Sequence, residues 1–430
     1  MIKQTLKPAK QNLTGAIHVP GDKSVSHRAV IMGSIAEGRT EVTNFLNSED
    51  SMRTVNAFRE MGVKITDNGT DLIIEGKGIS ALKEPLNPLY FGNSGTTTRL
   101  MLGLLAGLPF FSMIHGDDSL TKRPMNRVVD PLKMMGAVID GRDNGNLLPL
   151  AVRGSILQGI NYKLPVKSAQ VKSCLLLAGL LADGVTKITE ETLTRNHSEN
   201  MLKAFGADIH TDDHTTTITN KNKLSAVPVF VPGDISSAAF FLAAASIVPN
   251  SSLVLHDVGL NKTRTGILDV LYEMGAGMEI LNEQEKSGER SADLTITYSE
   301  LQGTTIEGEI IPRLIDEIPI IALIATQADG TTIIKDAEEL RVKETDRIKA
   351  VVDVLSGLGA DIQATADGMI IHGKTPLIGG RIPPYNDHRI AMMAAIASLI
   401  AKEEVIIEDI SPVNTSYPDF FRDLNKIMNG

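Results

Sequence analysis

Positively charged side chains stand near the start of two apolar segments of this chain. Lys23 lies in "DKSVSHRAVIMGSIAEG" and Arg389 lies in "NDHRIAMMAAIASLI". Both segments are predicted helices, and the first turn of a helix exposes N–H groups at the positive end of its dipole. A cation in that turn costs a few tenths of a kcal/mol up to about 1 kcal/mol. We therefore expect a bound anion, such as a phosphate or a carboxylate, to compensate for both charges.

Two further segments carry clustered charges. The segment "LRVKETDRIKAVVDVLSGLGAD" predicts one amphipathic helix, on which Lys343 and Arg347 share a face beside Glu344. Lys122 and Arg123 precede a proline in a predicted loop before a helix. Taken alone, such charge runs are typical of a solvated surface. Basic loops can also close over phosphates, so both segments are candidates for the anion site.

Other chemistry-bearing patterns indicate structure rather than a site. The segment "GMIIHGKT", residues 368–375, matches the phosphate-loop pattern, but its middle reads as a strand and Pro376 follows where a helix should begin. The nine histidines are scattered without metal-ligand spacing, so no metal is expected. Cys174 lies in the apolar run "KSCLLLAGLL" and is predicted to be a structural thiol, since one cysteine forms neither a disulfide nor a thiolate cluster.

The composition is typical of a globular protein of two or three domains. The chain has 430 residues, of which 42% are hydrophobic and 22% charged, and a formal net charge of −10. This net charge argues against non-specific binding to nucleic acid. The first residues lack the apolar core of a signal peptide, and the apolar runs are shorter than the roughly 20 residues of a membrane span. We expect a soluble, cytoplasmic protein with no membrane partner.

The elements that position the charged residues repeat along the chain. Five predicted helices end in a glycine that precedes a predicted strand, as in "FREMGVKI" and "LSGLGADI". A glycine at this place is the usual stop of a helix, where the backbone needs a positive φ. These glycines are Gly62, Gly136, Gly206, Gly275 and Gly359.

A second repeated feature is a buried helix with a polar start, followed by a β-rich run. Six such helices imply six units of βαβαββ type, and runs such as "GTTIIKD" count against a helical solenoid. The last unit is too short, and the N-terminal "TLKPAKQNLTGAIHVP" has the right size to complete it. The six helices are predicted to begin near Lys23, Asn93, Ser168, Ser236, Asp316 and Asn386.

Six units divide naturally into two α/β domains of three units each. One domain is expected over residues 19–231, and the other joins residues 1–18 with 232–430. The chain then crosses between them twice, at two copies of the turn "VPGD". The copy after Val19 is followed by Lys23, His27 and Arg28, whereas the copy after Val231 is followed only by small and apolar residues. The repeated frame therefore carries charges that differ between the domains.

The ordered motifs resemble the 5-enolpyruvylshikimate-3-phosphate synthase family, the enolpyruvyl transferases of the shikimate pathway that leads to aromatic amino acids. The resemblance implies a two-domain, inside-out α/β barrel with an active site in the cleft between the domains. It also implies a monomer that needs no cofactor or metal. The motifs, in the order of the family, are "PGDKSVSHRA", "GNSGTTTRL", "TKRPMNR", "KSAQVKS", "TRNHSEN", "RVKETDR", "NDHRIAM" and "SYPDFF".

The implied reaction joins shikimate 3-phosphate and phosphoenolpyruvate and releases phosphate. The 5-hydroxyl adds to carbon 2 of phosphoenolpyruvate through a tetrahedral intermediate, which then eliminates phosphate. Both substrates carry a phosphate and a carboxylate, so a site with several cations suits them. The resemblance further implies inhibition by the herbicide glyphosate, which occupies the space of phosphoenolpyruvate beside Gly95.

The resemblance assigns roles to residues that match the motifs. The proton carriers are Asp316 and Glu344, with Lys23 as a cationic partner, and the resemblance leaves open which carboxylate protonates the methylene carbon. His388 is a candidate for a supporting role. Phosphoenolpyruvate is assigned to Lys23, Asn93, Gly95, Arg123, Gln170, Arg347 and Arg389. Shikimate 3-phosphate is assigned to Lys23, Ser24, Arg28, Ser168, Gln170, Arg195, Asp316 and Lys343.

The sequence departs from some family members at four places. Glu339 and Thr415 stand where some members have Asn and Lys, so the contacts of those residues are not transferred. Ala169 replaces a serine that many members use for the substrate phosphate, and "TRNHSEN" differs from their loop. We hypothesise that Arg195 supplies the lost phosphate contact.

Two other functions are alternatives to the one that the resemblance implies. The UDP-N-acetylglucosamine enolpyruvyl transferases share the fold and the donor, but they rely on a catalytic cysteine in a mobile loop. Here residues 117–127 are basic and contain no cysteine, and Cys174 lies in an apolar helix. A non-catalytic repeat scaffold is the other alternative, and it gives no reason for cations at the starts of buried helices.

Overall fold

The structure is a computed structural model that describes residues 1–429, which divide into two compact units. Unit 2 comprises residues 21–231 and 285–289, and unit 1 comprises residues 1–20, 232–284 and the chain from residue 290 onward. The sequence predicted two passages of the chain between the units. The structure has four, because the short segment 285–289 belongs to unit 2 while the chain on either side of it belongs to unit 1.

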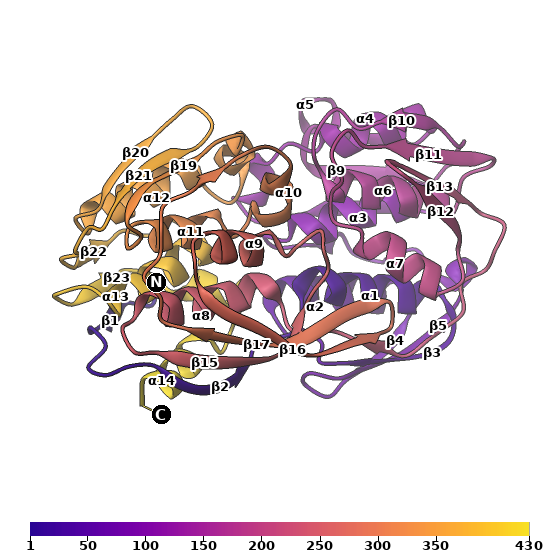
Figure 1. The fold of residues 1–430 in the computed structure, drawn as a ribbon. Helices are drawn as coiled ribbons and strands as arrows, with labels where there is room; N and C mark the ends of the chain where they lie inside the picture. Colours follow the sequence, from indigo (N-terminus) through magenta and orange to yellow (C-terminus); the bar gives the residue numbers. More distant parts are fainter. Residues whose placement is uncertain (430) are drawn as a thin grey trace. The chain divides into compact units, whose positions relative to one another are not determined.

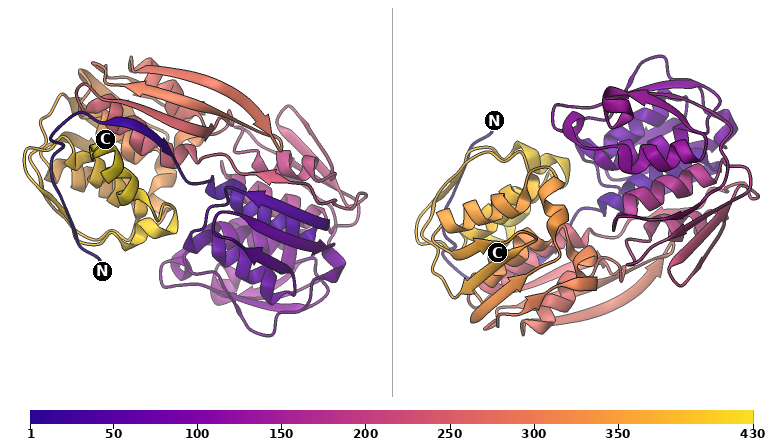
Figure 2. Two further views of the ribbon diagram at one scale, coloured as in Figure 1. Left: turned by 90° about the horizontal axis from the view of Figure 1, so that it is seen from below. Right: turned by 90° about the horizontal axis from the view of Figure 1, so that it is seen from above.

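Six small sheets repeat one topology, in agreement with the six predicted units (Figures 1 and 2). In each sheet the first strand is parallel to the second, and the second is antiparallel to the third. A parallel pair of adjacent strands needs a crossover, which a helix supplies. The strand orders are β14-β3-β5-β4, β6-β7-β9-β8 and β10-β11-β13-β12 in unit 2, and β2-β15-β17-β16, β18-β19-β21-β20 and β22-β23-β1 in unit 1.

Unit 2 has helices on the inside and strands on the outside (Figure 2). Its strands are β3 (Glu37–Thr43), β4 (Lys64–Asp67), β5 (Leu72–Lys77), β6 (Leu89–Tyr90), β7 (Phe111–His115), β8 (Val138–Gly141), β9 (Leu147–Arg153), β10 (Asn161–Lys163), β11 (Val185–Thr189), β12 (Asp208–Asp212), β13 (Thr215–Thr219) and β14 (Val229–Phe230). Its helices are α1 (Lys23–Ile35), α2 (Glu49–Glu60), α3 (Gly95–Leu105), α4 (Asn126–Met134), the short α5 (Arg142–Gly145), α6 (Ala169–Gly179) and α7 (His197–Ala204), with the 3-10 turns η1 (Ile79–Ala81) and η2 (Leu120–Lys122).

Unit 1 repeats the same plan. Its strands are β1 (Gln4–Leu6), β2 (Thr14–His18), β15 (Ser252–Gly259), β16 (Gly277–Lys286), β17 (Glu289–Thr297), β18 (Thr305–Ile306), β19 (Gly330–Ile334), β20 (Asp361–Ala364), β21 (Met369–Gly373), β22 (Gly380–Ile382) and β23 (Val405–Ile407). Its helices are α8 (Ile235–Ile247), α9 (Gly266–Glu273), α10 (Ile311–Leu314), α11 (Ile318–Ala325), α12 (Arg347–Gly357), α13 (His388–Ser398) and α14 (Phe420–Asn429), with η3 (Gly308–Ile310), η4 (Glu338–Val342) and η5 (Ser411–Thr415).

The N-terminal segment completes two units rather than one. Strand β1 pairs antiparallel with β23 and so fills the short sixth unit, as predicted. Strand β2 instead lies parallel to β15 and is the first strand of the fourth unit. The prediction assigned the whole segment to the sixth unit, because periodicity alone does not show that one leftover segment contains two strands of different sheets.

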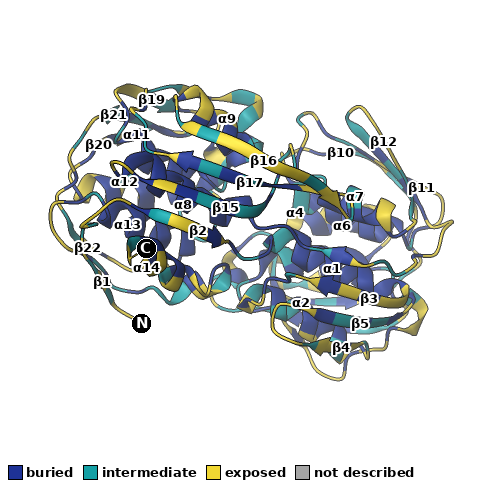
Figure 3. Cartoon of the chain, turned by 60° about the horizontal axis from the view of Figure 1, so that its bottom comes forward, coloured by how far each residue is buried: buried dark blue, intermediate teal, exposed yellow. Residues whose placement is uncertain are grey.

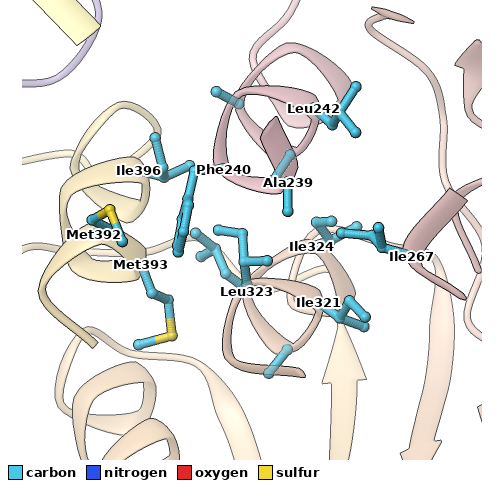
Figure 4. Packing of buried hydrophobic residues seen from close by; sticks show 14 of the residues in the cluster. Ala239, Phe240, Leu242, Ile267, Ile321, Leu323, Ile324, Met392, Met393 and Ile396 are labelled. Atoms are coloured by element: carbon cyan, nitrogen blue, oxygen red, sulfur yellow. The ribbon is translucent and has the colours of Figure 1, made fainter. Parts of the chain in front are cut away.

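The core of unit 1 lies between three helices from three different repeats. Every residue of α8, α11 and α13 is buried, and the three helices pack against one another (Figure 3). Phe240 of α8, Leu323 of α11 and Met393 of α13 meet in this core (Figure 4). In unit 2, α3 and α6 pack closely in the same way. The buried helices thus gather their first turns within each unit.

The glycine stops are confirmed at all five places. Each lies beyond the end of its helix with φ between 87° and 101°, the left-handed region in which glycine has no steric penalty. The six buried helices also begin within two residues of the predicted starts.

One predicted helix begins later than expected. The sequence places Lys343 and Arg347 on one face of a single helix, but α12 begins at Arg347, and Lys343 follows the 3-10 turn η4. The side chain of Asp346 accepts a hydrogen bond from the backbone N–H of Lys349 and so caps α12 at this point. Lys343 and Glu344 therefore lie in the connection before the helix.

Candidate active site

Arg347 is the centre of a charged cluster in unit 1. Its Nε donates to Asp387 Oδ2 at 2.7 Å, and its Nη2 donates to Glu344 Oε2 at 2.5 Å. The Arg347 side chain is only 1% exposed. Burial opposes its charge, but the carboxylates of Asp387, Glu344 and Asp316 outweigh that effect and raise the pKa of Arg347 above its ordinary value. Arg347 is thus a permanent cation that fixes the carboxylates around it.

Asp316 faces three cations at once. Its Oδ1 lies 3.2 Å from Nη1 of Arg347 and 3.8 Å from Nζ of Lys343, and its Oδ2 lies 3.8 Å from Nη2 of Arg389. The Asp316 side chain remains 15% exposed, so a ligand can reach it. Lys343 also pairs with Glu339 at 3.1 Å. The five unit 1 residues expected from the sequence to bind or react, Asp316, Lys343, Glu344, Arg347 and Arg389, are therefore brought together.

The cluster reaches the first turn of α8 through a chain of contacts. Arg389 Nη1 lies 3.7 Å from Oε1 of the buried Glu317, which accepts a hydrogen bond from Ser236. Ser236 Oγ also accepts a hydrogen bond from Arg264 at 2.6 Å. The "VPGD" copy of unit 1 therefore does have a cation at its helix start. Arg264 comes 28 residues after Ser236, beyond strand β15, so the comparison of the two copies could not reveal it.

His388 lies beside this cluster in α13. Its Nδ1 is 3.4 Å from Oγ1 of Thr415. Thr415 is the residue noted in the sequence analysis as standing where some family members have Lys. Asp387 caps the helix by accepting from the backbone N–H of Arg389 at 2.9 Å. The same carboxylate binds Arg347. Asp387 therefore caps a helix and also holds the central arginine, and only the first role could be expected from its position in the sequence.

In unit 2, Arg28 connects three elements. It donates from Nη1 to the carbonyl oxygen of Ser24, from Nε to Ser198 Oγ at 2.6 Å and from Nη2 to Ser173 Oγ at 2.7 Å. Arg28 is 3% exposed, and burial lowers its pKa to about 10 although Glu199 opposes the shift. At neutral pH it is still a cation, with its guanidinium held at the meeting point of α1, α6 and α7.

Asn93, Gly95 and Arg123 also come together. Arg123 donates to the side-chain oxygen of Asn93, whose amide donates to Asp117 at 3.0 Å. A Cβ built on Gly95 would lie 3.4 Å from Nη1 of Arg123 and 2.9 Å from Nη1 of Arg99. The first turn of α3 therefore has room for a ligand between two arginines only because residue 95 is glycine.

Arg99 is a candidate site residue that the sequence analysis missed. It donates from Nη1 to Gln170 Oε1 at 2.7 Å, and Gln170 donates to Thr96 Oγ1 at 3.1 Å. Gln170 is thereby held between the starts of α3 and α6, with Ser168 as the N-cap of α6. An arginine inside the apolar run "TTTRLMLGLL" was the signal that could have identified it.

Lys23 and Arg195 complete the set expected in unit 2. Lys23 opens α1, and its Nζ lies 3.2 Å from Asp50 Oδ2 of α2. Arg195 is half-buried just before α7, and its charge acts on Arg28. Behind it, the buried Lys172 lies 2.6 Å from Glu190 and 2.7 Å from Glu199, an ion-pair triad that the sequence analysis did not find.

Two other buried groups in the helices of unit 2, His27 of α1 and Cys174 of α6, carry no charge. His27 is fully buried, and burial together with Lys23 and Arg28 lowers its pKa to about 3. Burial likewise raises the pKa of the Cys174 thiol far above its ordinary value, which agrees with a structural thiol. Residues 369–373 of the phosphate-loop pattern form strand β21, as the sequence analysis expected.

A metal centre and a membrane-spanning helix are both absent from residues 1–429. No group of three or more histidine, cysteine, aspartate or glutamate side chains is arranged to hold a metal ion. Among the same residues, no helix is both long enough and apolar enough to cross a membrane.

Known proteins resemble this chain over nearly its whole length. The family model of EPSP synthase (3-phosphoshikimate 1-carboxyvinyltransferase) matches residues 8–424. The 3-phosphoshikimate 1-carboxyvinyltransferase of Oceanobacillus iheyensis is 60% identical over 98% of this chain and 99% of the relative. The Bacillus subtilis protein of the same name is 56% identical over 97% of this chain and 98% of the relative.

A solved structure supports the same grouping. The EPSP synthase of Acinetobacter baumannii superposes with a TM-score of 0.89 at 43% identity, covering 99% of this chain and 98% of that one. The expected α/β fold is confirmed by this likeness. The family match, the identities and the fold agree with the motifs, and the chain belongs to the EPSP synthase family of 3-phosphoshikimate 1-carboxyvinyltransferases.

Proposed function

We propose that two clusters act together on one pair of substrates in the reaction of the family. The first is the charged cluster of unit 1 around Arg347, and the second is the set of site residues in unit 2, Lys23, Ser24, Arg28, Asn93, Gly95, Arg123, Ser168, Gln170 and Arg195. The reaction transfers the enolpyruvyl group of phosphoenolpyruvate to the 5-hydroxyl of shikimate 3-phosphate and releases phosphate. The observation that carries the assignment of residues is the contact of Asp316 with three cations, Lys343, Arg347 and Arg389. A carboxylate beside several cations suits proton transfer between two anionic substrates.

Shikimate 3-phosphate is recognised mainly by unit 2. Arg28 binds its carboxylate, because the guanidinium is buried and already oriented by Ser24, Ser173 and Ser198. Ser168 and Arg195 bind its phosphate. Arg195 supplies the phosphate contact that many family members make with a serine at the position of Ala169. The remaining ligands are Lys23, Ser24, Gln170, Asp316 and Lys343.

Phosphoenolpyruvate binds where the arginines of the cluster converge. Arg347 and Arg389 bind its carboxylate, and Lys23 and Arg123 bind its phosphate. The space above Gly95, bounded by Arg123 and Arg99, accepts the phosphate oxygens. Asn93 and Gln170 complete the set of proposed ligands, and both are held by arginine side chains.

The addition step needs one proton removed and one proton delivered. Asp316 accepts the proton of the 5-hydroxyl while the oxygen of that hydroxyl forms a bond to carbon 2 of phosphoenolpyruvate. Carbon 3 takes up a proton from Lys23 or Glu344 and becomes a methyl group. The product is a tetrahedral intermediate in which carbon 2 carries the methyl, the carboxylate, the phosphate ester and the new ether.

Elimination reverses the proton movements at carbon 3. A basic group, Glu344 or Lys23, removes a methyl proton, the double bond forms again, and the bond from carbon 2 to the phosphate oxygen breaks. The leaving phosphate takes up the proton that Asp316 accepted from the hydroxyl, so Asp316 is ionised again and the overall reaction neither gains nor loses protons. Positive charges around the phosphate stabilise this departure. His388 supports the site by its place beside Arg389.

We also propose that the enzyme works in the cytoplasm as a monomer, without nucleic acid or membrane partners. Its two substrates are multiply charged and do not cross membranes unaided. The residues assigned to binding and proton transfer all come from one chain.

Phosphate release tests the assignment directly. The purified protein is incubated with phosphoenolpyruvate and either shikimate 3-phosphate or UDP-N-acetylglucosamine. Turnover is expected only with shikimate 3-phosphate. Turnover with the sugar nucleotide would identify the rival transferase, and no turnover with either acceptor would support a non-catalytic scaffold.

A further inference from the structure

The tip of one hairpin supplies unit 2 with a buried carboxylate. Strands β16 and β17 are joined by Ser287 and Gly288, which both have positive φ, 54° and 79°. This conformation is the tight two-residue turn of a β-hairpin. The tip, Glu285–Glu289, belongs to unit 2, whereas the rest of the hairpin belongs to unit 1. Glu289 is 5% exposed although both neighbours in the sequence, Gly288 and Arg290, are exposed.

The position of the tip is fixed by contacts with β14. Ser287 Oγ donates to the carbonyl oxygen of Pro228 at 3.1 Å and accepts from the backbone N–H of Phe230 at 3.2 Å. Nζ of Lys286 lies 4.6 Å from the centre of the Phe230 ring, a cation–π contact. Glu289 is therefore delivered to one place in unit 2.

That place is the first turn of α7. Glu289 Oε1 lies 2.8 Å from Nδ1 of His197 and accepts a hydrogen bond from Asn200 Nδ2 at 3.5 Å. His197 is 2% exposed. Losing a buried contact of a carboxylate costs far more than losing a contact at the surface. The pair therefore restrains where α7 begins.

The same turn carries the groups assigned to shikimate 3-phosphate. Ser198 accepts from Arg28 at 2.6 Å, and Glu199 pairs with Lys172 at 2.7 Å. Arg195 comes two residues before His197 in the chain. Three consecutive residues of α7 are thus held by three different elements, and Arg195 is separated from them only by Asn196, the N-cap of the helix.

We propose that Glu289 and His197 are positioning residues that hold Arg195 and Arg28 in place for shikimate 3-phosphate. The proposal rests on the proposed function of these two arginines. Neither Glu289 nor His197 needs to touch the substrate. Their effect is expected on the affinity for shikimate 3-phosphate and not on the affinity for phosphoenolpyruvate, because Asn93, Gly95 and Arg123 lie on other elements of unit 2.

The test measures the Kd of shikimate 3-phosphate by titration calorimetry on the full chain, together with KM for phosphoenolpyruvate. Glu289→Ala and His197→Ala should each raise the Kd at least tenfold and leave the KM within twofold. The Kd of the double variant should be no more than about twice the Kd of the weaker-binding single variant, because the two substitutions break the same contact. Glu285→Ala is the matched control, since it removes an exposed carboxylate from the same tip, and its Kd should not change.

Glu289→Gln keeps the size of the side chain and a hydrogen-bond acceptor, so it replaces Glu289→Ala if that variant does not fold. It should raise the Kd at least threefold. A folded Glu289→Ala or Glu289→Gln with an unchanged Kd, or with equal losses for both substrates, would overturn the proposal. Arg195→Ala separates the two claims. A raised Kd in Arg195→Ala with an unchanged Kd in the Glu289 variants refutes only the positioning role, whereas an unchanged Kd in Arg195→Ala refutes the role of Arg195 itself.

Discussion

Asp316 Oδ1 accepts a hydrogen bond from Nη1 of Arg347 at 3.2 Å, although the two residues are 31 positions apart in the sequence. This contact places a carboxylate at the start of α11 against a buried cation at the start of α12. Both helices belong to one repeat, whose sheet is β18-β19-β21-β20, so the contact joins the starts of its two helices.

Replacing Asp316 by Asn should lower kcat by roughly 10²–10⁴-fold, the usual contribution of a general acid or base. The amide keeps the shape and hydrogen bonds to Arg347 but cannot take up the hydroxyl proton. Steady-state kinetics checks this, with Glu339→Gln as the control because Glu339 also pairs with Lys343 and has no assigned step. A kcat of Asp316→Asn within fivefold of the parent would remove Asp316 from the proton-transfer role.

Gly95→Ala should raise KM for phosphoenolpyruvate roughly tenfold, the effect of a modest steric clash. The added Cβ would lie 2.9 Å from Nη1 of Arg99, so this guanidinium must move, and it would be in van der Waals contact with Nη1 of Arg123 at 3.4 Å. Inhibition by glyphosate should weaken in parallel. The KM for shikimate 3-phosphate should stay within twofold, and equal increases in both KM values would contradict the placement of phosphoenolpyruvate beside Gly95.

His27 should make the protein less stable in acid. Its pKa is about 3 in the folded state because of burial, Lys23 and Arg28, against 6.5 in the unfolded chain. Between these values the unfolded chain binds the proton more readily, so the free energy of unfolding falls as pH falls from 6.5 towards 3. At pH 5 the loss from this group is about 2 kcal/mol relative to neutral pH.

The measurement compares urea unfolding at pH 7.5 and pH 5. His27→Gln removes the titrating group, so this variant should lose about 2 kcal/mol less than the parent between the two pH values. His210→Gln, at an exposed position of β12, serves as the control and should follow the parent. Equal losses in His27→Gln and the parent would show that His27 does not contribute to acid sensitivity.

Cys174→Ala should keep kcat and both KM values within twofold. The thiol is buried in α6, and burial raises its pKa, so it is a poor nucleophile. A Cβ on Gly103 of α3 would lie 2.1 Å from the carbonyl oxygen of Cys174, which shows how closely the two helices approach here. A cost of about 1 kcal/mol in stability is expected from the lost packing. A hundredfold loss of kcat in a folded variant would revive a cysteine-dependent mechanism.

Local signals were sufficient to predict the repeated frame. The glycines after the helices and the polar starts of buried helices depend on neighbouring residues, and both features are found where they were expected. The division of the N-terminal segment between two sheets was not predicted, since β1 and β2 find their partners roughly 400 and 240 residues away. Strand pairing over such separations leaves no pattern in a single sequence.

The candidate site was predictable where a motif holds the residues, and incomplete where distant partners fix them. Asp316 and Arg347 are in recognisable motifs, and the structure brings them together. Arg264, Glu289 and Lys172 were missed, because each acts on a helix start from another element. The late start of α12 was missed because an N-cap at Asp346 looks like one more charge in a charged run.

Binding of shikimate 3-phosphate to variants of both clusters tests most directly whether the two clusters serve one substrate pair. Titration calorimetry compares Arg28→Met in unit 2, Lys343→Met in unit 1 and the exposed control Lys122→Met. The account predicts that the first two variants each bind at least tenfold more weakly and that the control binds like the parent. Lys343→Met with the affinity of the parent would contradict it.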